Sequence, residues 1–237
     1  MIKPQIVAQD YGIHNANMDA TIRRVNESGV WKKLDSILII PAAGMVPTKV
    51  VASWLNMYAP PNNKLYRMFP LGLEVGEAYS QCIENILAHP DLSKFKYIIT
   101  IEHDNVIPPD GLVKLLESME ANQQFAGISG LYHTKGENGV PQIWGDPSDP
   151  ELNFRPQAPV PGKIVECCGI AQGFAAFRLD MFKDERIKRP WFRTIKDAGC
   201  ATQDLAMASE ARKYGYRFAV DCSILVGHYS VDDDITW

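Results

Sequence analysis

Two carboxylates flank a histidine in the segment Glu102-His103-Asp104, which directly follows an apolar run at residues 97–101. Carboxylate oxygens in this pattern suit a hard divalent cation such as Mg²⁺ or Mn²⁺, or the hydroxyl groups of a sugar. If the chain stays extended past residue 101, alternation puts Glu102 and Asp104 on one face and His103 on the other. The alternative is that these acids only cap the following helix or meet water.

A further acid and a further histidine come much later in the chain. Asp204 stands in the first turn of a predicted helix that Thr202 can cap, where the helix dipole stabilises a carboxylate by about 0.3 to 1 kcal/mol. This helix-dipole stabilisation alone is a sufficient reason for an acid at this position. Asp204 is therefore a catalytic candidate only if other functional groups lie beside it. His228 ends an apolar run, and such a histidine is more often capped or solvated than bound to a metal.

The run at residues 97–101 is the element that must position the first acids. It has no polar alternation beyond Thr100, which predicts a strand covered on both faces, as in the middle of a parallel sheet. In open α/β sheets, ligands bind beyond the carboxyl ends of the strands. We therefore expect Glu102, His103 and Asp104 at the functional edge of the sheet.

Strands and helices alternate through the first half of the chain. Short connections between them predict an α/β fold, Rossmann-like, with a mostly parallel central sheet flanked by helices. Pro41, Ala42 and Ala43 follow the first strand and form either a turn that a ligand can approach closely or an ordinary connection. The predicted strands are residues 36–40, 65–69, 97–101 and 125–131, and the predicted helices are residues 47–58, 74–88 and 108–119, with a short helix near residues 18–25.

The second half of the chain is less regular and should hold a small second sheet. Residues 133–162 form a long loop rich in Pro, Gly, Asp and Asn, which is more typical of a lid or binding loop than of a connection without a function. Trp144 can stack on a sugar or base, or pin this loop to the core. Small residues surround Gln172 and Gly173, and Gln172 offers both a hydrogen-bond donor and an acceptor. The predicted strands are residues 163–168, 173–178, 216–220 and 221–228, with a helix at residues 202–214.

Bulk properties fit an enzyme of one domain spanning residues 1–237. The net charge of −4 is spread along the 237 residues and argues against a nucleic-acid partner, which would require a basic stripe. Five cysteines without a C-x-x-C spacing indicate reduced thiols in a cytoplasmic protein. No apolar segment has the length of a membrane span, and the first residues lack the core of a signal peptide. Residues 1–33 are either an arm over the domain or an oligomer interface.

Taken in order, these motifs resemble the GT-A glycosyltransferases, and more narrowly their inverting, family-2-like members. The resemblance runs from about residue 37 to residue 229 and is strongest at residues 98–110 and 169–228. It implies a hexosyltransferase that uses a UDP- or GDP-type sugar donor, with Mn²⁺ or Mg²⁺ as cofactor. Glu102-His103-Asp104 matches the family's Asp-x-Asp motif, which binds metal and nucleotide, and Asp204 matches its catalytic base.

The same resemblance implies the other site residues. His228 matches the late histidine that completes the metal site with Asp104 and Glu102. Segment 41–43 matches the position that holds the nucleotide base, and residues 172–173 the acceptor region, with the long loop beside it. Asp104, Asp204 and His228 must therefore meet at one cleft.

Departures from the family pattern keep two alternatives open. Glu102 replaces an aspartate, Gln203 replaces an acid, and the family's usual arginine has no match near Tyr79. These changes also fit a catalytically silent nucleotide-sugar-binding module. A nucleotidyltransferase of similar fold needs a glycine-rich basic loop after the first strand, but residues 41–49 hold a single lysine and little glycine.

Overall fold

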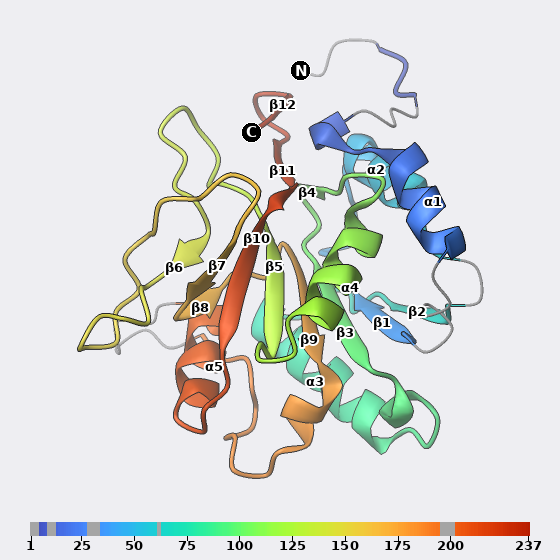
Figure 1. Cartoon of the computed structure of the whole chain (residues 1–237). Helices are drawn as coiled ribbons and strands as arrows, with labels where there is room; N and C mark the ends of the chain where they lie inside the picture. Colours follow the sequence, from blue (N-terminus) through green and yellow to red (C-terminus); the bar gives the residue numbers. More distant parts are fainter. Residues whose placement is uncertain (1–4, 9–12, 28–33, 61–62, 195–201) are drawn as a thin grey trace.

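The computed structural model describes residues 5–8, 13–27, 34–60, 63–194 and 202–237. A seven-stranded sheet forms its centre (Figure 1). Five strands point the same way, while β9 and β7 run antiparallel to their neighbours. The α/β fold with a mostly parallel central sheet is thereby confirmed. In spatial order the strands are β2 (Leu65–Met68), β1 (Ser36–Ile39), β3 (Tyr97–Ile101), β9 (Phe174–Arg178), β5 (Gly127–Leu131), β10 (Phe218–Leu225) and β7 (Ile164–Cys167).

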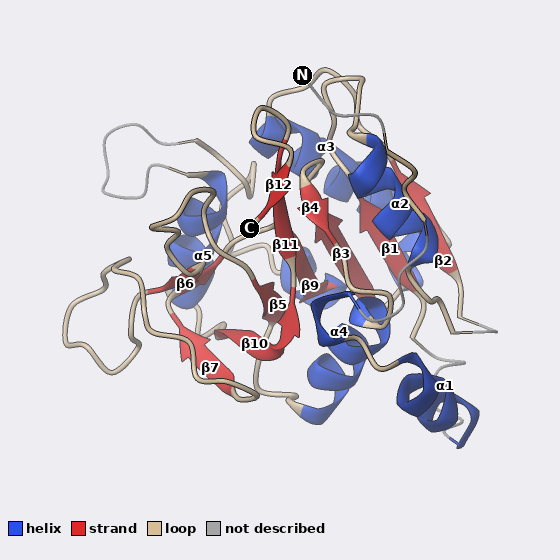
Figure 2. Cartoon of the chain, turned by 90° about the horizontal axis from the view of Figure 1, so that it is seen from above, coloured by secondary structure: helices blue, strands red, loops and turns tan. Residues whose placement is uncertain are grey.

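Helices cover both faces of this sheet, as the view from above in Figure 2 shows. α4 packs on β5, β9 and β10 from one side, with α1 outside it, while α3 and α5 pack on the other side. α2 lies beside the short strand β4 (Asn105–Val106), which follows β3 and belongs to a second, smaller sheet. The helices are α1 (Met18–Glu27), α2 (Thr48–Asn56), α3 (Val75–Ala88), α4 (Gly111–Ala121) and α5 (Gln203–Arg212), with 3₁₀ turns at Ile13–Asn15, Leu92–Lys94 and Leu179–Lys183.

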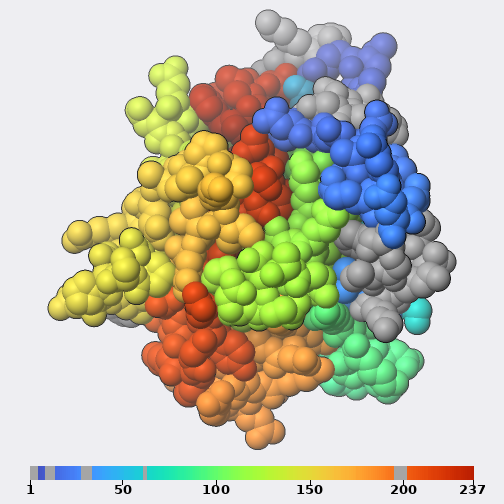
Figure 3. Space-filling view, in the orientation of Figure 1, coloured from blue at the N-terminus to red at the C-terminus, as the bar shows by residue number. Residues whose placement is uncertain are grey.

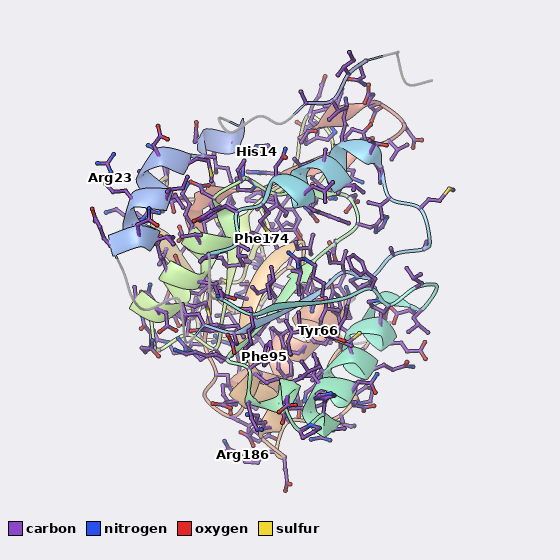
Figure 4. The ribbon with its side chains drawn as sticks, turned by 90° about the vertical axis from the view of Figure 1, so that its right-hand side faces the viewer. His14, Arg23, Tyr66, Phe95, Phe174 and Arg186 are labelled. Carbon is purple, nitrogen blue, oxygen red and sulfur yellow. The ribbon has the colours of Figure 1, made fainter. Side chains whose placement is uncertain are left out.

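Strand β3 shows why this sequence makes a central strand. Successive side chains alternate between the two faces, so Ile98 joins the cluster under α3 while Ile99 and Ile101 join the cluster under α4. All three are fully buried, which is worth about 1.5 to 3 kcal/mol for each side chain. Phe174 of β9 lies in the same interior, whereas Tyr66 of the edge strand β2 is 49% exposed (Figure 4).

Two small sheets complete the fold, and one of them carries part of the site. β4 (Asn105–Val106), β11 (Gly227–Ser230) and β12 (Ile235–Thr236) form a three-stranded sheet beyond the ends of β3 and β10. β6 (Ile143–Trp144) pairs with β8 (Gly169–Ile170) beside α5.

Two features of the local structure differ from what the sequence led us to expect. The chain turns at residues 103–104 and the Asn105 N–H donates to the Glu102 carbonyl at 3.1 Å, so Glu102 and Asp104 do not share the face of an extended strand. Instead of two strands at residues 216–220 and 221–228, the chain forms one strand, β10 (Phe218–Leu225), whose register shifts between Asp221 and Leu225, and then β11 (Gly227–Ser230). The register shift lets one long strand pass from the central sheet towards the small one.

Other features of the described residues bear on earlier expectations. No helix among them is long and apolar enough to cross a bilayer. Cys82, Cys167, Cys168 and Cys222 are free and buried, while Cys200 lies outside the described residues. Parts of the expected N-terminal arm, at residues 1–4, 9–12 and 28–33, also lie outside them.

Candidate functional site

The candidate site lies at the edge where β3 and β10 end. β9 runs antiparallel to β3, so its amino end reaches the same edge and brings Gln172 and Gly173 there. The Glu102 N–H donates to the Gly173 carbonyl at 3.3 Å, which joins the two segments directly. The strand order thus collects residues that are separated by about seventy positions in the sequence.

Asp104 and His228 meet at this edge. The Tyr229 N–H donates to the Asp104 carbonyl at 2.8 Å, and His228 pairs with Asn105 in the β4–β11 ladder. His228 Nε2 lies 3.2 Å from Asp104 Oδ2, and each side chain is 18% exposed. Lys135 Nζ lies 2.6 Å from the same carboxylate oxygen. Burial alone would raise the pKa of Asp104, but the hydrogen bonds from His228 and Lys135 hold it well below its usual range.

The geometry of His228 permits a test of the expected cation site. His228 Nδ1 lies 2.9 Å from the His133 carbonyl, which can only accept, so Nδ1 carries a proton. In a neutral ring Nε2 is then an acceptor facing the carboxylate of Asp104, and the contact needs either a proton or a metal ion between the two. A carbonyl on Nδ1 is also the usual support of a metal-bound histidine.

Asp104 and His228 fit a cation that takes only part of its coordination shell from the protein. Among the described residues, no group of three His, Cys, Asp or Glu side chains is placed to hold a metal ion, so Glu102 does not complete a three-ligand site. Mg²⁺ is commonly held by one or two carboxylates together with substrate phosphates. Asp104 and His228 can serve such a phosphate-bound ion, and the histidine ligand suits Mn²⁺.

Glu102 and Asp204 lie close enough to interact electrostatically. Burial, followed by the negative charges of Asp204 and Asp104, raises the pKa of Glu102 to about 8. Burial also raises the pKa of Asp204, although hydrogen bonds from the Thr202 side chain and the Leu205 N–H oppose the shift. The Leu205 N–H donates to Asp204 Oδ1 at 2.9 Å in the first turn of α5. Burial therefore makes Asp204 a carboxylate that takes up a proton more readily than an exposed one.

Two tyrosines belong to this cluster, and sequence reasoning missed their role. Tyr79 of α3 is fully buried, and its pKa is raised well above the usual value by burial and then by the charges of Glu102, Asp204, Cys82 and Asp104. Tyr132 accepts a hydrogen bond from the Gly173 N–H at 2.9 Å and packs edge-on against His228, with ring centroids 5.6 Å apart. The signal for Tyr79 was a phenol at a buried helix position, where its hydroxyl must find a polar neighbour.

Buried polar atoms without a protein partner gather at the same edge. Gln172 is fully buried, yet neither its Oε1 nor its Nε2 has a hydrogen-bond partner in the described part of the chain. The Tyr79 hydroxyl is in the same situation. Because a buried polar group without a partner costs about 1 to 3 kcal/mol, such atoms indicate a place for water or a ligand.

A cleft of about 770 Å³ opens onto Asp104. The C-terminal segment bounds one side of the cleft. In Figure 3 this segment lies beside the yellow-green tip at upper left, and that tip is the hairpin of residues 133–141. Asp204 is 8% exposed and, like Glu102 and His228, does not line this cleft, so of the three residues expected to meet at one cleft only Asp104 lines it. The lining residues are Gln5, Val7, Met45, Val46, Pro47, Thr48, Lys49, His103, Asp104, Lys135, Tyr229 and Val231.

The remaining expected site residues take different places. Segment 41–43 follows β1, with Ala42 bridged to Leu71, and leads into the cleft-lining residues 45–49. His103 is exposed and lines the cleft. Trp144 is half-buried in β6 opposite Gly169 and is not among the residues that line the cleft.

Comparison with known proteins supports the fold. No known protein family and no curated protein matches the sequence. Among solved structures, the crystal structure of A197 from STIV is similar, with a TM-score of 0.60 at 15% sequence identity. The match covers 85% of this chain and 92% of that one. The chain therefore shares its overall α/β architecture with A197 at a level of identity that speaks for the fold alone.

Proposed function

We propose that this chain, acting as one domain, is a metal-dependent GT-A glycosyltransferase. It transfers a sugar from a nucleoside-diphosphate donor of UDP or GDP type to an acceptor hydroxyl, with inversion. The observation that carries the proposal is the meeting of Asp104, His228, Glu102 and Asp204 at one sheet edge from three distant parts of the sequence. The donor base would lie near residues 41–43 and the diphosphate in the cleft at Asp104.

The leaving diphosphate gains negative charge as the glycosidic bond breaks. Asp104 and His228 would hold Mn²⁺ or Mg²⁺, which supplies electrostatic stabilisation of that charge when bound. His228 is oriented for this task by the His133 carbonyl, and Tyr132 packs against its ring. Glu102 does not group with this pair as a third metal ligand, and its carboxylate is better suited to donor or acceptor hydroxyls.

Asp204 is the proposed general base. The acceptor oxygen bonds to the anomeric carbon, its proton passes to the Asp204 carboxylate, and the electrons of the broken glycosidic bond leave with the diphosphate. Burial raises the pKa of Asp204, as a base in this position requires, and burial together with the charges of Asp204 and Asp104 raises the pKa of Glu102. The unpartnered amide of Gln172 can hydrogen-bond an acceptor hydroxyl near the same edge.

The test is a donor screen scored by release of nucleoside diphosphate in the presence of Mn²⁺. The Asp204→Asn variant should lose about 10²- to 10⁴-fold in turnover while it keeps donor binding. Full turnover in that variant would reject the base assignment. Metal-dependent binding of a nucleotide sugar by the wild type without any turnover would instead favour the silent binding module.

A further inference from the structure

Lys135 stands at the tip of a hairpin that reaches the cleft. His133 and Pro141 form an antiparallel bridge, and the Thr134 N–H donates to the Val140 carbonyl at 2.9 Å. The Thr134 hydroxyl oxygen accepts from the Val140 N–H at 2.8 Å, which closes the hairpin. The backbone around Lys135 is thus held in place, while its side chain is 37% exposed.

The ammonium group of Lys135 and a metal ion would compete for the same oxygen. Lys135 Nζ is 2.6 Å from Asp104 Oδ2, the oxygen that also faces His228 Nε2. A divalent cation between Asp104 and His228 would lie beside this ammonium, and two cations at one oxygen repel each other. Metal binding at this oxygen of Asp104 is therefore favoured when the Lys135 side chain moves away.

Lys49, the other lysine of the cleft lining, is held more firmly. Its Nζ is 2.7 Å from Asp234 Oδ1 and lies over the Tyr229 ring, 5.5 Å from the ring centroid. Tyr229 also donates to Asp234 Oδ1 at 2.7 Å, so lysine, acid and phenol form one fixed group. Lys135 has only Asp104 as its ion-pair partner among the described residues.

We propose that Lys135 is a phosphate-binding residue that exchanges partners during donor binding. In the ligand-free protein it neutralises Asp104. When a divalent cation arrives with a diphosphate, the cation takes Asp104 and Lys135 turns to a phosphate oxygen. The exchange keeps every charge paired in both states, since the diphosphate supplies the anion that the cation takes from Lys135. This inference rests on the proposed function, because the metal at Asp104 is part of it.

The experiment measures two affinities whose changes have opposite signs. Binding of Mn²⁺ alone is followed by water-proton relaxation, and binding of inorganic pyrophosphate in saturating Mn²⁺ by calorimetry. In Lys135→Ala the competing ammonium is gone, so the Kd for Mn²⁺ alone should fall by about two- to fivefold. The Kd for pyrophosphate should rise by about tenfold, because a charge-assisted hydrogen bond is lost. Lys135→Arg should keep pyrophosphate binding within about threefold.

Lys94→Ala is the matched control, since it removes one charge from an exposed ion pair with Asp91 outside the cleft. It should leave both affinities unchanged. Unchanged or weaker Mn²⁺ binding in Lys135→Ala, or unchanged pyrophosphate binding, would overturn the exchange and leave the transferase proposal standing. The expected pair of changes without sugar transfer from any donor would reject the transferase and retain Lys135 as a phosphate-binding residue.

Discussion

Gly173 offers a sharp test of how tightly the site is packed. A Cβ at this position would lie 2.5 Å from both Asn105 Oδ1 and Tyr132 Cζ, and 2.7 Å from the Tyr132 hydroxyl oxygen. Asn105 is fully buried and Tyr132 is 4% exposed, so neither can swing into solvent. Gly173 does not have a positive φ, and the effect of Gly173→Ala therefore comes from the contact and not from backbone strain.

Both displaced groups contact the segment that carries His228. Asn105 donates to the Gly227 carbonyl at 3.2 Å, and the Tyr132 ring packs against the histidine. Overpacking of this kind costs about 1 to 3 kcal/mol, which corresponds to a fall of about 2 to 12 °C in Tm for a chain of this size. Because misplacement by about 1 Å can cost about 10²-fold in rate, donor turnover should fall further than the loss of stability explains.

Thermal unfolding and Mn²⁺ binding of Gly173→Ala are the appropriate assays. Gly162→Asn is the control, since Gly162 has a φ of +69° that asparagine tolerates and no atom lies within 4 Å of its added Cβ. The control should melt within about 2 °C of the wild type. A Gly173→Ala variant with wild-type Tm and wild-type Mn²⁺ affinity would show that the site is looser than these distances indicate.

Two further predictions concern buried acids. Because the pKa of Asp204 is raised in the folded protein, its contribution to stability is fully present below the unfolded pKa and is lost as pH rises through the folded pKa. The Tm of Asp204→Asn should therefore rise relative to that of the wild type as pH increases from 5 to 8. A difference in Tm that shrinks over this range in paired melting curves would contradict this. Asp110 is fully buried, accepts from the Asn17 N–H at 2.9 Å and pairs with Lys114 Nζ at 2.9 Å. Asp110→Ala should lower the free energy of unfolding in urea by about 3 kcal/mol and should speed hydrogen exchange in α1. Unchanged exchange there would show that other contacts hold the helix.

Local patterns were sufficient to predict the central strand and its acidic end. The unbroken apolar run of β3 predicted burial on both faces, and the structure confirms it. Helical periodicity likewise located α3, whose residues Val75–Ala88 nearly match the expected 74–88. Both signals depend on neighbours in the sequence, which is why they could be read without knowledge of the tertiary contacts.

Long-range partners could not be predicted in the same way. Asp110 was expected at the start of a helix, and it does occupy the N-cap of α4, but its carboxylate makes no cap hydrogen bond and instead accepts from the N–H of Asn17, 93 positions away. The sequence did not indicate Lys135 as a site residue, because its partner Asp104 is 31 positions away and is reached only through a hairpin. The turn at residues 103–104 also takes Asp104 out of the extended strand on which the expected alternation depended.

The ladder between β4 and β11 has a consequence for how this site can change over time. It sets the spacing of Asp104 and His228 through peptide groups, with the Tyr229 N–H on the Asp104 carbonyl and Gly227 opposite Val106. Peptide groups are the same whichever side chain a residue carries. Surrounding positions can therefore be replaced, and specificity can drift to new sugars or acceptors, while the distance between the two proposed ligands is inherited unaltered.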